Sequence, residues 1–178
     1  VRTGNYVMEL KNVGSFESTF LDTNQASSKT NLLKIIEFCN KHQIRIKEHN
    51  TDYLSDRALQ LHPEIGIHAA NIAPEFAVAE TRAFLSLLKK YKLERELEKF
   101  IEISYSSKKW QKWMLSDSKL GKQEKAIISG HYIFGKNEFI DLKNDVERKI
   151  SLKSTLDSYL KLEVKKSIIR YLNLFSMI

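Results

Sequence analysis

The chain has 178 residues and a formal net charge of +7 at pH 7. Its residues are 42% hydrophobic and 29% charged, a composition that excludes a disordered chain. The length indicates a single globular domain over residues 1–178. The one cysteine, Cys39, excludes an internal disulfide and favours a reducing compartment. No apolar run approaches the roughly 20 residues that span a bilayer, so we expect a cytoplasmic protein.

The first predicted elements are a strand and a helix. A short strand is expected over residues 6–10, followed by a polar loop over residues 14–25. Ser27 and Ser28 are predicted N-caps of the helix that follows. Apolar residues three and four positions apart continue this helix to Cys39.

The middle of the chain is expected to return to strands. β-branched residues in alternation predict a strand over residues 44–49, and an apolar, glycine-containing run predicts another over residues 65–70. Between them, residues 50–52 are predicted to cap a short helix that extends to Leu61, before Pro63 interrupts.

The second half of the chain is predicted to be mainly helical. Pro74 suits the first turn of a helix, because its ring fixes φ and it has no N–H to leave unpaired. A strand rich in apolar and β-branched residues is expected to interrupt the helices over residues 126–134. Helices are expected over residues 74–91, 138–149 and 155–174 and within the charged stretch 89–125.

Strands that alternate with helices predict an α/β fold with a parallel sheet. An open doubly wound sheet and part of a (β/α)₈ barrel both satisfy this pattern. A whole barrel needs roughly 200 residues or more, so this chain would supply about half of one. No glycine-rich loop follows the first strand, which weakens the nucleotide-binding form of the open sheet.

Polar residues follow three of the predicted strands, where a parallel α/β fold gathers its functional groups. Histidine and carboxylate side chains bind divalent metals or move protons. The catalytic candidates are Glu48, His49, Asp52 and His131. The candidate ligands for Zn²⁺ or Mn²⁺ are His49, His68 and His131. The substrate-binding candidates are His68, Asn71, Ser129 and Gly130.

Most candidates also have a structural alternative. Glu48 and His49 suit a Glu–His pair on the surface. Asp52 suits a helix cap, His68 and His131 suit the core, and Ser129-Gly130 suits a plain turn rather than a phosphate site. Two further histidines, His42 and His62, have no evident role in the sequence.

Residues 108–113 interleave lysine and tryptophan as single-strand binders do, although packing of the two tryptophans against the fold is the interpretation we favour.

Residues 48–53, Glu-His-Asn-Thr-Asp-Tyr, resemble a strand end of the GatZ/KbaZ-type subunits of class II tagatose-bisphosphate aldolases, which carry His-Ser-Thr-Asp-Tyr. Asn50 replaces the serine here. Residues 76–81 are similar to the Phe-Ala-Leu-x-Glu-Ala pattern that opens a helix in that family. The resemblance is clearest over residues 44–90 and continues through residues 130–134. The family has a lysine and a glycine where this chain has residues 68–71.

The resemblance implies the C-terminal half of a TIM (β/α)₈ barrel with additional C-terminal helices. It implies a subunit in carbohydrate metabolism that binds a phosphorylated ketose and supports a separate catalytic aldolase, with that aldolase or the missing barrel half as a partner. One alternative is a metal-dependent sugar-phosphate epimerase or aldolase in its own right. The other is a basic nucleic-acid-binding domain, which the even spread of charge disfavours.

Overall fold

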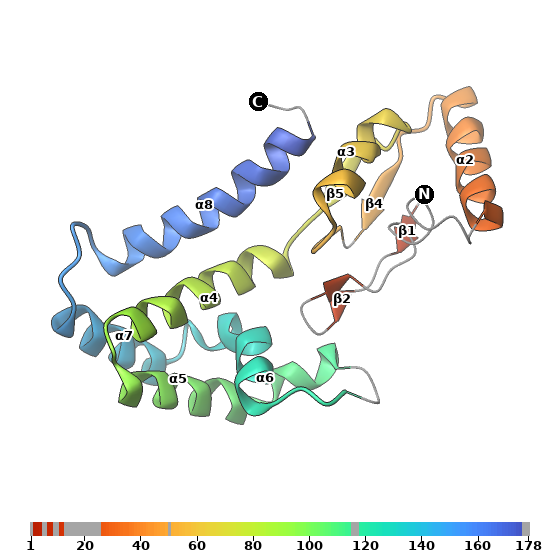
Figure 1. Ribbon diagram of the computed structural model, residues 1–178. Helices are drawn as coiled ribbons and strands as arrows, with labels where there is room; N and C mark the ends of the chain where they lie inside the picture. Colours follow the sequence, from red (N-terminus) through yellow and green to blue (C-terminus); the bar gives the residue numbers. More distant parts are fainter. Residues whose placement is uncertain are drawn as a thin grey trace. The chain divides into compact units, whose positions relative to one another are not determined.

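The computed structural model describes residues 2–4, 7–8, 11–12, 26–49, 51–114 and 118–175. The chain divides into two compact units, which are residues 1–75 with 169–178, and residues 76–168. Figure 1 labels the helices and strands of both units. None of the helices described is both long and apolar enough to cross a membrane. The expectation of a single domain over residues 1–178 stays a prediction.

The first unit contains a parallel sheet of three strands in the order β1-β4-β5. These strands are β1 (Arg2–Gly4), β4 (Lys47–His49) and β5 (Ala69–Asn71). Helix α2 (Ala26–Lys41) lies in the connection from β1 to β4, and α3 (Asp56–Glu64) connects β4 to β5. Parallel strands require such crossovers, so this unit has an α/β arrangement.

The register of the sheet places the ends of its strands at one level. Gly4 pairs with His49, and His49 pairs with Asn71, so all three strands end together. Two further strands, β2 (Val7–Met8) and β3 (Lys11–Asn12), form a separate antiparallel pair.

The strand expected over residues 6–10 is only partly correct. Part of the strand expected over residues 6–10 is β2, which pairs with β3 instead of joining the parallel sheet. The rest of it, and the loop expected over residues 14–25, lie outside the described residues.

The strand expected over residues 65–70 begins later, at Ala69. Ile65 caps α3, and Gly66 has a φ of 89°, so these two residues form a turn before the strand starts. Helix α2 begins at Ala26, which places Ser27 and Ser28 inside the helix instead of at its N-cap.

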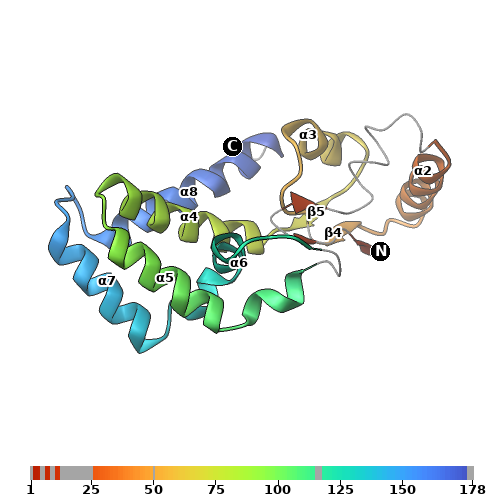
Figure 2. The same cartoon turned by 60° about the horizontal axis from the view of Figure 1, so that its bottom comes forward.

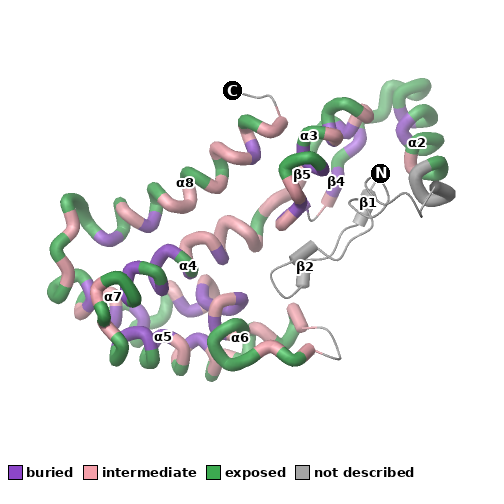
Figure 3. Tube along the Cα trace, in the orientation of Figure 1, coloured by how far each residue is buried: buried purple, intermediate pink, exposed green. Residues whose placement is uncertain are grey.

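The first unit has a small apolar core. Ile36 and Cys39, three positions apart on α2, are both buried, as the helical spacing predicts. Figure 3 shows the buried positions along the chain. The other buried apolar residues of this unit are Ile46, Leu54, Ala58, Leu59 and Ile67.

The second unit is entirely helical in its described residues. Its α-helices are α4 (Pro74–Lys90), α5 (Glu94–Ser106), α6 (Lys122–Ser129), α7 (Asn137–Lys149) and α8 (Leu156–Leu174). Its 3-10 helices are η2 (Lys109–Trp113) and η3 (Gly130–Ile133). Helix α5 packs against α6 and α7, which can be followed in Figure 2. The first residues of α4 and the last residues of α8 belong to the first unit.

Three aromatic rings form the centre of the second unit's core. Phe84, Phe100 and Phe139 are 5.4 to 5.9 Å apart between ring centroids and meet at tilted or edge-to-face angles. Aromatic pairs prefer these angles to flat stacking. Leu87, Leu88, Leu142, Val146 and Leu156 are buried around them.

The strand expected over residues 126–134 is wrong, because these residues form α6 and η3. The carboxylate of Glu124 accepts a hydrogen bond of 2.8 Å from the N–H of Gly121, just before the helix begins. Ala126 and Ser129 of α6 are buried three positions apart, and so are Gly130 and Ile133 of η3, as helical spacing places them. Packing therefore overrides the strand preference of Ile127 and Ile128.

Candidate functional site

The carboxyl ends of the parallel strands bring together several of the predicted site residues. His49 and Asn71 are paired in register and half-buried. The N–H of Thr51 donates a 3.0 Å hydrogen bond to the Asn71 carbonyl, which holds the segment after β4 against the end of β5. Asn50, part of the motif that suggested this site, lies outside the described residues. The strand ends are therefore the candidate site.

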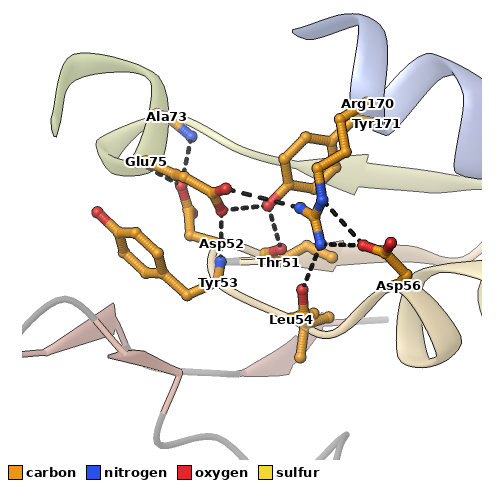
Figure 4. Close-up of polar contacts among 9 residues, drawn as sticks. All are labelled: Thr51, Asp52, Tyr53, Leu54, Asp56, Ala73, Glu75, Arg170 and Tyr171. Carbon is orange, nitrogen blue, oxygen red and sulfur yellow. Dashed lines mark hydrogen bonds and ion pairs between the residues drawn. The ribbon is translucent and has the colours of Figure 1, made fainter. Parts of the chain in front are cut away.

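Asp52 joins this site to the first turn of α4. Its Oδ1 atom accepts hydrogen bonds from the N–H groups of Ala73 at 3.1 Å and Glu75 at 2.8 Å (Figure 4). Backbone N–H groups at a helix start attract anions, and here the chain's own carboxylate occupies that position at the start of α4. Asp52 was also expected to cap α3, but Ser55 does so, with its Oγ atom 3.2 Å from the Ala58 nitrogen.

Glu75 and Tyr171 complete a buried polar network that sequence reasoning missed. The Glu75 carboxylate accepts a 2.6 Å hydrogen bond from the N–H of Tyr53 and another from the Tyr171 hydroxyl. Tyr171 is 2% exposed and lies in the last turn of α8. The hydroxyl also lies 3.4 Å from the Thr51 carbonyl oxygen. The last turn of α8 thus contacts the segment that follows β4 and the first turn of α4.

Arg170 fixes the same turn of α8 to the loop after β4. Its guanidinium donates a 2.9 Å hydrogen bond to the Leu54 carbonyl and forms an ion pair with Asp56 at 2.5 Å. A second guanidinium nitrogen lies 3.6 Å from the Glu75 carboxylate. Figure 4 shows these contacts converging from α8, α4 and the loop. The guanidinium thus contacts two carboxylates, those of Asp56 and Glu75.

The protonation of Asp52 is shifted towards neutral pH. Burial raises its pKa from 3.8 to about 6, and the charge of Glu75 adds to the shift, although the N–H groups of Glu75 and Ala73 oppose it. Burial and the hydrogen bond to Glu75 also raise the pKa of Tyr171, which stays protonated and donates. A carboxyl with a pKa near 6 is suited to general acid–base work.

Replacing Asp52 by Asn is expected to change the pH dependence of stability. The carboxyl ionises near 3.8 in the unfolded chain and near 6 in the folded one, so between these values the folded state binds more protons. The free energy of unfolding of the wild type should therefore fall, relative to Asp52→Asn, as the pH rises through this interval. Urea unfolding at a series of pH values measures this difference. Asp141→Asn, on the exposed face of α7, is the control, and parallel curves for wild type and Asp52→Asn would contradict the shift.

Glu48 was expected to be catalytic at the strand ends, but it is paired inside the unit. Its side chain is fully buried and contacts Nε2 of His62, which is 1% exposed. His62 Nδ1 lies 2.8 Å from the Ala58 carbonyl oxygen, so Nδ1 carries a proton and donates it. The ring meets Phe175 edge-on at 5.7 Å. His62, which the sequence left without a role, is thus the partner of Glu48.

The remaining predicted residues do not join the strand ends as expected. His68 precedes β5 and is exposed, with its Nδ1 atom 3.3 Å from the Ile46 N–H. Ser129, Gly130 and His131 belong to the second unit and lie on helices, so their predicted position at a strand end is wrong. Ser129 forms a buried 3.0 Å hydrogen bond with Ser104 instead.

The described residues do not fit the expected metal ion. Among them, no group of three or more His, Cys, Asp or Glu side chains is arranged to hold a metal. Protein sites for Zn²⁺ supply three or four ligands. His49, His68 and His131 form no such group, so the metal-dependent epimerase stays a prediction without a ligand set.

No protein family model, curated protein or solved structure matches the chain. The resemblance to the tagatose-bisphosphate aldolase subunits therefore stays a prediction. A proposal of function therefore rests on the geometry of the strand ends.

Proposed function

We propose that the first unit is an arc of a (β/α)₈ barrel and that the chain is a cytoplasmic subunit of the tagatose-bisphosphate aldolase type. The observation that carries this proposal is the order of the parallel strands, β1-β4-β5, with their ends aligned at Gly4, His49 and Asn71. Adjacent strands of a barrel follow the order of the chain, and its functional groups lie at their carboxyl ends. Either half of a doubly wound sheet also has its strands in chain order, and the resemblance at residues 48–53 is what favours the barrel here.

A phosphorylated ketose would bind at the strand ends. His49 and Asn71 lie side by side there, and both side chains can hydrogen-bond to sugar hydroxyls. Asp52 and Glu75 accept hydrogen bonds from backbone N–H groups of the chain itself and hold together the segments that border the site. Because both carboxylates are engaged in this way, a supporting role beside a catalytic aldolase is favoured over catalysis by this chain.

Exposed apolar side chains around α2 support a protein partner. Leu33, Ile35 and Phe38 of α2 and Ile44 just after it are 40 to 59% exposed. Among the described residues, β1 and β5 are also the edge strands of the parallel sheet. Parallel sheets are normally covered on both faces and edges, so the catalytic subunit or a second barrel half would cover this region.

The experiment is co-expression with a catalytic class II tagatose-bisphosphate aldolase, followed by sedimentation and assay of ketose bisphosphate cleavage. We expect a complex with higher turnover than the catalytic subunit alone. Phe38→Ser should weaken the complex, and His49→Ala with Asn71→Ala should lower the affinity for ketose phosphate in thermal-shift titrations. Lys153→Ala, exposed between α7 and α8, is the control.

Two results would contradict the proposal. Absence of any complex together with absence of a thermal shift would remove the aldolase-subunit function. A thermal shift of the same size with the free ketose and with its phosphate would remove the phosphate from the ligand.

A further inference from the structure

A surface of the second unit combines aromatic rings with lysines and has no part in the function proposed above. It is formed by the end of α5, by η2, by α6 and by η3, and η2 packs against both α5 and α6. We call it the aromatic–lysine surface. Its members are Tyr105, Trp110, Lys112, Trp113, Lys125 and Tyr132.

The rings of this surface are held in fixed orientations. Trp110 stacks on Tyr105 with ring centroids 5.4 Å apart and 13° between the planes, and its indole N–H donates to the Tyr105 carbonyl at 2.9 Å. The indole N–H of Trp113 donates to the Tyr132 hydroxyl at 3.3 Å. All four rings are only half-buried, so parts of them face solvent. A ligand would meet rings that are already ordered.

Two lysines of this surface lie over the ring faces. The Lys125 ammonium is 4.7 Å from the Trp110 ring, and the Lys112 ammonium is 4.5 Å from Tyr132 and 5.0 Å from Trp113. Within the part of the chain that the structure describes, neither lysine forms an ion pair, whereas the neighbouring Lys122 pairs with Glu102. Among the described residues, the positive charge of these two lysines is therefore not compensated by an ion pair.

A nearby histidine responds to this charge. Burial, and then the charge of Lys112, lower the pKa of His131, whose ring is 3.9 Å from that of Tyr132. Lys112 thus lies close enough to His131 for its charge to disfavour protonation of the ring.

We propose that the aromatic–lysine surface binds single-stranded nucleic acid. Phosphates would draw Lys112 and Lys125 off the rings, and bases would stack on the faces that the lysines leave. Stacking of a base on an aromatic side chain is stronger than a lysine–ring contact at an exposed position, so this exchange is favourable. An acidic peptide would engage the lysines but leave the rings unused, and the bases of a duplex are already stacked on each other.

Tryptophan fluorescence tests the proposal directly, because Trp110 and Trp113 are the chain's two tryptophans. Titration of the whole chain with a short oligothymidylate at low salt should quench the fluorescence. The double variant Lys112→Gln/Lys125→Gln should bind more weakly. Its slope of log affinity against log salt should be smaller in magnitude by about 1.4, since each lost contact with a single-strand phosphate removes about 0.7.

A charge-matched control is Lys89→Gln/Lys153→Gln, two exposed lysines outside the surface. It should bind and quench like the wild type. Circular dichroism checks the fold of both double variants, and the wild-type titration alone decides the outcome if either fails to fold. Absence of quenching would overturn the proposal. Equal quenching by inorganic polyphosphate, by polyglutamate or by duplex DNA would overturn it as well, since the rings would then not be reading unstacked bases.

Discussion

Replacing Glu48 by Leu is expected to lower the free energy of unfolding by about 3 kcal/mol. The variant removes the Glu48 carboxylate that His62 Nε2 contacts, while the imidazole ring stays buried inside the first unit. A polar group left unpaired in the interior loses its water without a replacement, and this desolvation is the main cost. Urea unfolding followed by far-ultraviolet circular dichroism measures the change.

The double variant Glu48→Leu/His62→Leu separates the unpaired group from the lost packing. With both polar side chains replaced by apolar ones, no group is left without a partner, and most of the lost stability should return. Glu37→Leu, on the exposed face of α2, is the control for removal of a charge and should change stability by no more than about 0.5 kcal/mol. A double variant that is as unstable as the single one would show that the pair contributes through packing alone.

Replacing Gly130 by Ala is expected to destabilise the second unit by about 2 kcal/mol. A Cβ atom there would lie 2.5 Å from the Thr81 methyl group, 2.6 Å from its hydroxyl and 3.0 Å from the Phe100 ring. The backbone of Gly130 has a φ of −54°, which alanine adopts easily, so the cost arises from the close approach of α4 and α5 alone. Tryptophan fluorescence during urea unfolding reports on this unit, which contains both tryptophans.

A compensating substitution tests the cause of that loss. Thr81→Ala removes the two nearest atoms, so Gly130→Ala/Thr81→Ala should be more stable than the sum of the two single changes predicts. Gly135→Ala is the matched control, because no atom lies within 4 Å of a Cβ at that position. Additive losses would show that Phe100, and not Thr81, sets the space around Gly130.

The three longest-patterned helices of the second unit, α4, α7 and α8, were predictable from local pattern. Helices α4, α7 and α8 begin and end within a residue or two of their expected limits, because their apolar residues repeat every three or four positions over several turns. The strand ends at His49 and Asn71 were also placed at one edge of a parallel sheet, since the carboxyl ends of parallel strands share an edge.

The contacts that close the candidate site could not be predicted in the same way. Tyr171 and Glu75 are 96 positions apart, and Glu48 and His62 are 14 apart, so neither pair leaves a local signal. The helix at residues 122–129 was missed because its β-branched residues imitate a strand. The helical structure of this segment depends on the close packing of Gly130 against Thr81 and Phe100, and these contacts exist only in the folded chain.

The position of Arg170 and Tyr171 has a consequence for the order in which the chain is completed during synthesis. The first unit takes these residues from beyond residue 168, after the whole of the second unit. The second unit has its last core residue, Leu160, before either of them leaves the ribosome. Domains usually fold in the order in which they are made, but here the unit begun first is finished last. Until α8 emerges, the nascent chain holds Asp52 and Glu75 without the tyrosine that covers them.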